Sequence, residues 1–182
     1  MTSIALTGHR PTKLDGYRLD TSFYARLGAA LAEIADTTVR SDLATGQITT
    51  LHSGMALGAD TLWAQQIVSV KRRYPSQVKF VAHVPFPGQP DRWPAHAQVA
   101  YQRLLNESDS IRVYGDTYSS IVMQRRNVGM IDAADTLIAV YDGSDSGGTA
   151  NAVRYARSVL KPMISLHPHT FRAAAQQPAW TN

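Results

Sequence analysis

Two glycine-rich segments of the chain have the composition of anion-binding turns. Residues 53–60 read SGMALGAD and residues 142–149 read DGSDSGGT, and each lies between an apolar run and a segment with helical spacing. Glycine lets backbone N–H groups approach a ligand closely, and the N-terminus of a helix attracts negative charge. The pattern therefore predicts phosphate-binding turns. Neither segment fits GxxxxGK[ST] or GxGxxG, so neither is a P-loop or a dinucleotide fingerprint.

A histidine and an arginine follow the first apolar run, in the segment Gly8-His9-Arg10-Pro11. Arg10 can bind a phosphate bidentately, and His9 can donate to a base or sugar or carry a proton near neutral pH. The alternative is an arginine paired with a carboxylate and a histidine that caps a turn. We expect both side chains at the end of a central strand.

Two carboxylates and two helical residues complete the polar candidates. Asp60 falls in the first turn of a helix, where it either caps the helix or binds a ribose hydroxyl. Asp142 follows an apolar run and is the best-placed carboxylate to orient a ligand; catalytic residues are otherwise unassigned, with Asp142 and Asp60 the candidates. Arg126 and Asn127 lie on or beside an apolar helix face, where they need partners inside the protein or in a cleft.

The predicted ligand-binding residues belong to these turns, to the proline-rich loop after the third strand and to the fourth helix: Gly8, His9, Arg10, Pro11, Ser53, Gly54, Met55, Ala56, Gly58, Asp60, Pro85, Phe86, Arg126, Asn127, Asp142, Gly143, Gly147, Gly148 and Thr149. No metal site is predicted, because His167 and His169 are too few and too local to argue for one. No cofactor is expected to be required, but a nucleotide-derived ligand is expected.

The elements that must position these residues alternate along the chain. Short apolar runs rich in β-branched or aromatic residues predict five strands and a sixth, at residues 3–7, 49–53, 78–84, 110–114, 136–141 and 163–166. Segments of helical period predict helices at residues 21–35, 57–73, 94–107, 119–134 and 149–160. This alternation is typical of an α/β protein with a mainly parallel sheet of five to six strands. In such a sheet, ligands bind outside the carboxyl ends of the strands.

Two segments lack a periodic pattern. Residues 36–47 contain Gly46 and are expected to form a surface excursion between the first helix and the second strand. Residues 168–182 carry no strand signal and are expected to be a C-terminal tail. The remaining residues, 1–167, are predicted to form a single domain.

Composition excludes several classes of protein. The chain has 182 residues, 44% of them hydrophobic and 18% charged, and no cysteine, which excludes a disordered chain, a disulfide scaffold and thiol chemistry. The net charge of +4 is mild and spread out, which disfavours nucleic acid as a partner. No run approaches the length of a membrane span, so we expect a cytoplasmic protein without membrane contact. Whether it forms a homodimer is left open.

Five segments occur in the order seen in a known family: GHRP, SGMALGAD, VPFPGQPDRW, MQRRNVGMIDAADTLIAVYDGS and SGGTANAV. In these segments the chain resembles a YpsA-like member of the SLOG superfamily, named for its Smf/DprA and LOG branches, from about Ile4 to Leu166. The resemblance implies a Rossmann-like three-layer αβα sandwich. It also implies a site for a nucleotide or nucleotide-derived ligand at the GHRP turn and the two glycine turns.

The chain departs from one branch of that superfamily at a catalytic position. LOG phosphoribohydrolases carry PGGxGTxxE, whose glutamate helps catalysis, whereas residues 146–153 here read SGGTANAV without a glutamate. The phosphate-binding half of the signature is thus kept better than the catalytic half.

Three functions follow as hypotheses. The leading one is a module that binds a nucleotide-derived small molecule, such as an NAD- or ADP-ribose-like compound or a nucleoside phosphate, as a sensor or sequestering protein. The second is an enzyme, a hydrolase that cleaves the N-glycosidic bond of such a ligand. The third, binding of single-stranded DNA, lacks the interleaved aromatic and basic residues of a stacking platform.

Overall fold

The computed structural model describes residues 2–176 and arranges seven strands in one sheet, in the order β4-β3-β2-β1-β5-β6-β7. The strands are β1 (Thr2–Gly8), β2 (Thr49–Ser53), β3 (Val78–Val84), β4 (Ser110–Val113), β5 (Thr136–Val140), β6 (Met163–Leu166) and β7 (Ala173–Gln176). All neighbours are parallel except β6 and β7, which pair antiparallel. The α/β class and the mainly parallel sheet are therefore confirmed.

The sheet has one strand more than the five to six predicted. The additional strand, β7, lies in the segment expected to be a tail, and its Ala174 pairs with Ser165 of β6. Its alanines have low strand propensity and gave no sequence signal, so it forms by pairing with an exposed sheet edge. Residues 177–182 of the expected tail lie outside the described residues.

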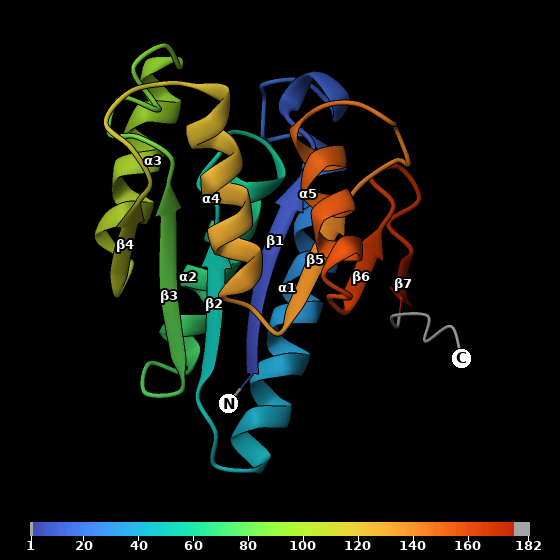
Figure 1. Ribbon diagram of the computed structural model, residues 1–182. Coiled ribbons are helices and arrows are strands. Elements are labelled where there is room, and N and C mark those ends of the chain that lie inside the picture. The colour runs from blue at the N-terminus through green and yellow to red at the C-terminus, as the bar shows by residue number, and fades with distance from the viewer. Residues whose placement is uncertain (1, 177–182) are drawn as a thin grey trace.

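Helices cover both faces of the sheet, as Figure 1 shows. They are α1 (Ser22–Ala44), α2 (Ala59–Arg73), α3 (Ala95–Asn106), α4 (Ser120–Asp132) and α5 (Gly148–Ser158), with a short 3-10 helix η1 (Pro11–Lys13). The central strand β1 alternates between two cores: Ile4 and Leu6 pack with α1, α2 and α3, whereas Ala5 packs with α4 and α5. These three layers form the Rossmann-like sandwich that the resemblance implied.

The strands place the candidate residues at one edge. β1 pairs in parallel with β2 on one side and with β5 on the other. The turns after these three strands therefore leave the sheet at the same edge, the upper one in Figure 1. They contain the GHRP turn and both glycine turns. The predicted central position of the first strand is confirmed.

The prediction of a loop over residues 36–47 is wrong, because α1 continues to Ala44. Its buried face extends through Ala35 and Val39 to Asp42. The Asp42 carboxylate accepts hydrogen bonds from the hydroxyls of Thr2 and Thr49, both at 2.7 Å. A polar residue thus takes a core position in the last turn, and it interrupts the apolar period on which the sequence prediction relied.

A chain of polar side chains lies buried beneath α4. His52 Nδ1 lies 3.0 Å from His83 Nε2, and His83 Nδ1 lies 2.6 Å from the Tyr114 hydroxyl. Both histidines are almost fully buried. Burial lowers the pKa of His52 to about 4 and, together with the neighbouring His52, the pKa of His83 to about 3. Both rings are therefore neutral in the folded protein near pH 7.

We expect these two histidines to make stability pH-dependent. In the unfolded chain both titrate near 6.5, above their folded values. The unfolded state therefore binds more protons as pH falls below 6.5, and stability decreases by up to about 1.4 kcal/mol per pH unit for each histidine. Urea unfolding at pH 7 and pH 5 measures this slope. His83→Gln should reduce it, and the exposed control His96→Gln should leave it unchanged; equal slopes in both variants would contradict the assignment.

Among residues 2–176, no helix combines the length and the hydropathy needed to cross a membrane.

Candidate functional site

The glycine turn after β2 is closed by the protein's own atoms. A Cβ atom at Gly54 would lie 2.5 Å from Asp60 Oδ1 and would overlap the Arg126 guanidinium. At Gly58, where φ is +101°, a Cβ would lie 2.5 Å from the backbone oxygen of His9. Both glycines therefore permit close packing of backbone and side chains inside the protein.

The N-terminus of α2, which follows this turn, has its amide groups engaged. Ala59 N–H donates to the His9 oxygen at 3.2 Å, and Thr61 N–H donates to the Ala56 oxygen at 3.0 Å. The backbone groups of Asp60 and Ala56 also act on the Asp60 carboxylate, where they oppose the rise in its pKa that burial causes. These donors hold the turns after β1 and β2 together, and this leaves little capacity for the phosphate that the sequence predicted here.

Asp60 and Arg126 form a buried ion pair beneath the turn. Their exposed fractions are 4% and 5%, and Arg126 Nη1 lies 3.4 Å from Asp60 Oδ1. Arg126 Nη1 also donates to the Gly54 oxygen. Burial raises the pKa of Asp60, against the opposing effect of Arg126, and burial lowers the pKa of Arg126. The structure therefore places both residues behind the turn, where they support its backbone.

His9 and Asp142 join the turns after β1 and β5. His9 Nε2 lies 2.8 Å from Asp142 Oδ1, and the ring is 3% exposed whereas the carboxylate is 33% exposed. Partial burial of Asp142 opposes its ionisation, but hydrogen bonds from Ser144 and His9 hold its pKa well below the usual range. His9 thus acts as a buried support that orients an ionised and accessible carboxylate at the sheet edge.

The glycine turn before α5 is open. Gly143 and Gly147 have φ values of +91° and +99°, and no atom lies within 4 Å of a Cβ placed at Gly143, Gly147 or Gly148. The cap residue Gly147 supplies no side-chain hydrogen bond to the first turn of α5. Thr149 is half-buried in that turn. Of the two glycine turns, this one keeps a helix N-terminus accessible to an anion.

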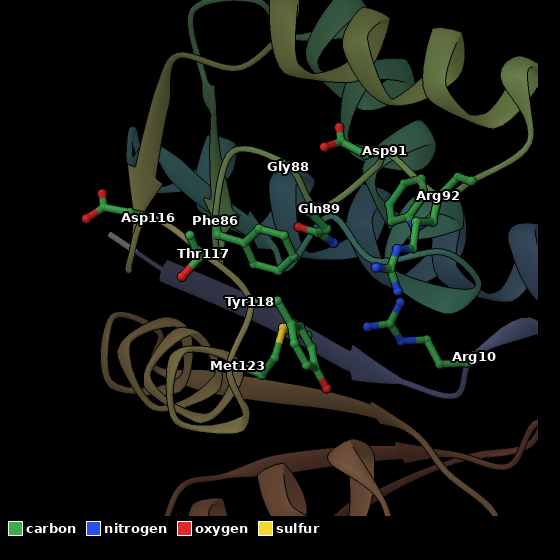
Figure 2. A pocket seen from close by; sticks show the side chains of 11 residues that line it. Arg10, Phe86, Gly88, Gln89, Asp91, Arg92, Asp116, Thr117, Tyr118 and Met123 are labelled. Carbon is green, nitrogen blue, oxygen red and sulfur yellow. The ribbon is translucent and has the colours of Figure 1, made fainter.

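A pocket of about 610 Å³ lies at the same edge of the sheet. It is lined by residues of the turn after β1, the loops after β3 and β4, and α4: Arg10, Phe86, Gly88, Gln89, Asp91, Arg92, Trp93, Asp116, Thr117, Tyr118 and Met123. Figure 2 shows the aromatic rings of Phe86 and Tyr118 on one side of it and the guanidinium groups of Arg10 and Arg92 on the other. The pocket thus combines flat apolar surfaces with positive charge.

The remaining predicted residues are buried within or next to their turns. Gly8 is buried against Ala59, and Pro11 and Pro85 are buried where their turns begin. Ser53, Met55 and Ala56 are buried in the closed turn. Asn127 is 8% exposed, and within residues 2–176 its amide has no hydrogen-bond partner, so water or a ligand must satisfy it.

Several pocket residues were missing from the sequence-based set. Arg92, Gln89 and Tyr118 come from loops without periodic structure, and Met123 comes from α4. The segment PGQPDRW is rich in turn residues but fits no motif that identifies a ligand contact. A proline-rich loop at the carboxyl end of a strand was the one available signal. No group of three or more metal-ligating side chains occurs among residues 2–176.

Comparisons with known proteins agree with this architecture. The family model described as the YspA SLOG family matches residues 4–165. A SPbeta prophage-derived protein of Bacillus subtilis, YoqJ, is 34% identical over 130 residues, which cover 64% of this chain and 75% of that protein. A UPF0398 protein of Bacillus velezensis is 24% identical over 97% of both chains.

One solved structure has a similar fold. It is DNA processing protein A from Helicobacter pylori, described for its single-stranded DNA binding mode, with a TM-score of 0.59 and 16% identity. The match covers 91% of this chain and 65% of that one. The chain is thus a Rossmann-like α/β protein of the SLOG type. It belongs to the YspA SLOG family, as the resemblance in its five segments indicated.

Proposed function

We propose that the protein binds a nucleotide-derived small molecule at the carboxyl edge of its sheet. Two observations support this proposal: the glycine turn before α5 is accessible, and a pocket lined by aromatic rings and arginines lies at the same carboxyl edge of the sheet. Lys13 Nζ donates to Ser144 Oγ at 3.0 Å and so links the turn after β1 to the glycine turn. Membership of the SLOG family also supports a nucleotide-related ligand.

A thermal-shift screen tests the proposal. The compounds are AMP, ADP, ATP, NAD, ADP-ribose, cyclic nucleotides and pyrimidine analogues, with a short single-stranded oligonucleotide as a separate arm. A ligand at about one hundred times its Kd stabilises the native state by about 2.7 kcal/mol. For a domain of this size the midpoint should rise by about 5–10 °C. No rise with any mononucleotide or dinucleotide at millimolar concentration would contradict the proposal.

A second candidate function, hydrolysis of an N-glycosidic bond, is favoured by the state of Asp142. An ionised carboxylate at this edge could stabilise positive charge that develops on a ribose ring, and His9 fixes its orientation. Because its pKa is lowered, Asp142 is a poor general acid, so the leaving base would need protonation from another group. Binding without turnover therefore remains the leading proposal.

Base release distinguishes binding from hydrolysis. If the protein only binds, chromatography after prolonged incubation should recover the nucleotide intact. Steady release of free base that Asp142→Asn abolishes would replace the binding proposal with the hydrolase.

Single-stranded DNA is an alternative ligand. The fold is similar to that of DNA processing protein A, which is described as binding single-stranded DNA. Binding through phosphate contacts would weaken steeply with salt. Salt-sensitive stabilisation by the oligonucleotide, with no effect of any small nucleotide, would favour this alternative.

A further inference from the structure

Two arginines of the pocket, Arg10 and Arg92, form no ion pair among residues 2–176, although the charge of Arg10 acts to lower the pKa of the buried Asp60. Arg10 comes from the turn after β1 and Arg92 from the loop after β3, and both line the pocket. Figure 2 shows their guanidinium groups pointing toward one another. Within residues 2–176 neither side chain has an ion-pair or hydrogen-bond partner. Facing like charges repel, so an anion between them would remove an unfavourable interaction.

The acidic residues of the pocket do not neutralise this pair. Asp91 and Asp116 also line it, but Figure 2 shows both carboxylates pointing away from the two guanidinium groups. A guanidinium fork matches the geometry of phosphate oxygens and binds them bidentately. The chemistry of this part of the pocket therefore fits a phosphate group held from two loops.

The opposite part of the pocket fits a nucleobase. The ring centroids of Phe86 and Tyr118 lie 5.9 Å apart, the ring planes meet at 75°, and both residues line the pocket. Gln89, 8% exposed, lies between Phe86 and Arg92 in Figure 2. Its Nε2 donates to the Met55 oxygen at 3.0 Å, whereas its buried Oε1 has no partner among the described residues. An orphaned acceptor beside aromatic rings suits an amino or hydroxyl donor on a nucleoside.

We propose that Arg10 and Arg92 together bind the terminal phosphate of a nucleoside phosphate whose base lies against Phe86 and Tyr118. This inference rests on the proposed function and specifies its ligand class. A terminal phosphate presents three unesterified oxygens and close to two negative charges, enough for both arginine forks at once. The open glycine turn before α5 is then free to bind the remaining part of a longer ligand.

Paired titrations of phosphorylated and unphosphorylated ligands test this assignment. Calorimetry measures the Kd of AMP and adenosine, with the guanine, cytosine and uracil pairs in parallel, for the unmodified protein and for Arg10→Gln and Arg92→Gln. Each substitution should weaken binding of the monophosphate about 10- to 100-fold, the range for a lost hydrogen bond to a charged group. Binding of the nucleoside should be unchanged. Arg103→Gln, at an exposed position of α3, is the charge-matched control and should alter neither.

Two results would overturn the assignment and leave the proposed function standing. One is loss of AMP binding in Gly148→Val but not in Arg10→Gln or Arg92→Gln, which would place the phosphate at the glycine turn. The other is an equal loss of affinity for AMP and for adenosine in the arginine variants. If no nucleotide or nucleoside binds the unmodified protein, both the assignment and the proposed function fail.

Discussion

Replacing Gly58 with alanine is expected to destabilise the protein by about 2–5 kcal/mol. Two costs add at this position. The backbone has φ of +101°, which disfavours any residue with a Cβ, and that Cβ would lie 2.5 Å from the backbone oxygen of His9. The oxygen cannot move aside easily, because it accepts the Ala59 N–H that joins the turns after β1 and β2. Urea unfolding of Gly58→Ala at pH 7 measures the loss.

Gly46 provides the matched control for this substitution. Its φ of +68° also favours glycine, but no atom lies within 4 Å of a Cβ placed there. Gly46→Ala should therefore show the backbone cost alone, about 1–2 kcal/mol. Equal losses in Gly46→Ala and Gly58→Ala would contradict the close approach of the two turns.

Replacing Arg126 with methionine should cost about 3–5 kcal/mol, the range for removing one partner of a buried ion pair. Methionine keeps most of the side-chain volume but leaves the Asp60 carboxylate unpaired at 4% exposure and the Gly54 oxygen without its donor. A loss of this size is a large part of the total stability of a domain. The midpoint of urea unfolding at pH 7 measures it.

Two further variants show whether the buried charge causes the loss. The neighbouring Arg125 is exposed, so Arg125→Met should change stability by less than about 0.5 kcal/mol. Adding Asp60→Asn to Arg126→Met removes the uncompensated charge and should recover part of the loss. If Arg125→Met and Arg126→Met had the same effect, the buried pair would not support the turn.

The periodic parts of the fold could be predicted from the sequence. Strands β2, β3 and β6 have the predicted bounds, because each is a short run with β-branched or apolar residues between turn residues or helical segments. The end of α1 was missed because Asp42 occupies a core position through hydrogen bonds to Thr2 and Thr49, which lie 40 and 7 residues away in sequence. β7 was missed because its alanines carry no strand signal and depend on the edge of β6.

The sequence predicted where the candidate site lies, but not which residues are accessible in it. The turns at the carboxyl ends of β1, β2 and β5 do meet at one edge, as a parallel sheet requires. Both glycine turns looked alike in sequence, yet one is closed by Arg126 and Asp60 and the other is open. That difference depends on a side chain 72 residues from Gly54, which no local pattern encodes. Arg92 was missed for the same reason, because only the fold brings its loop to the pocket that Arg10 also lines.

The most direct test of a nucleotide site at the carboxyl edge of the sheet is a nucleotide titration followed by amide chemical shifts. Spectra of the ¹⁵N-labelled protein would be recorded with AMP, ADP and the most stabilising compound of the thermal-shift screen. We predict saturable shifts at Arg10, at Gln89 and Arg92, and at Gly147 and Gly148, with no change at Gly46. Shifts confined to residues away from this edge, or none at millimolar nucleotide, would contradict it.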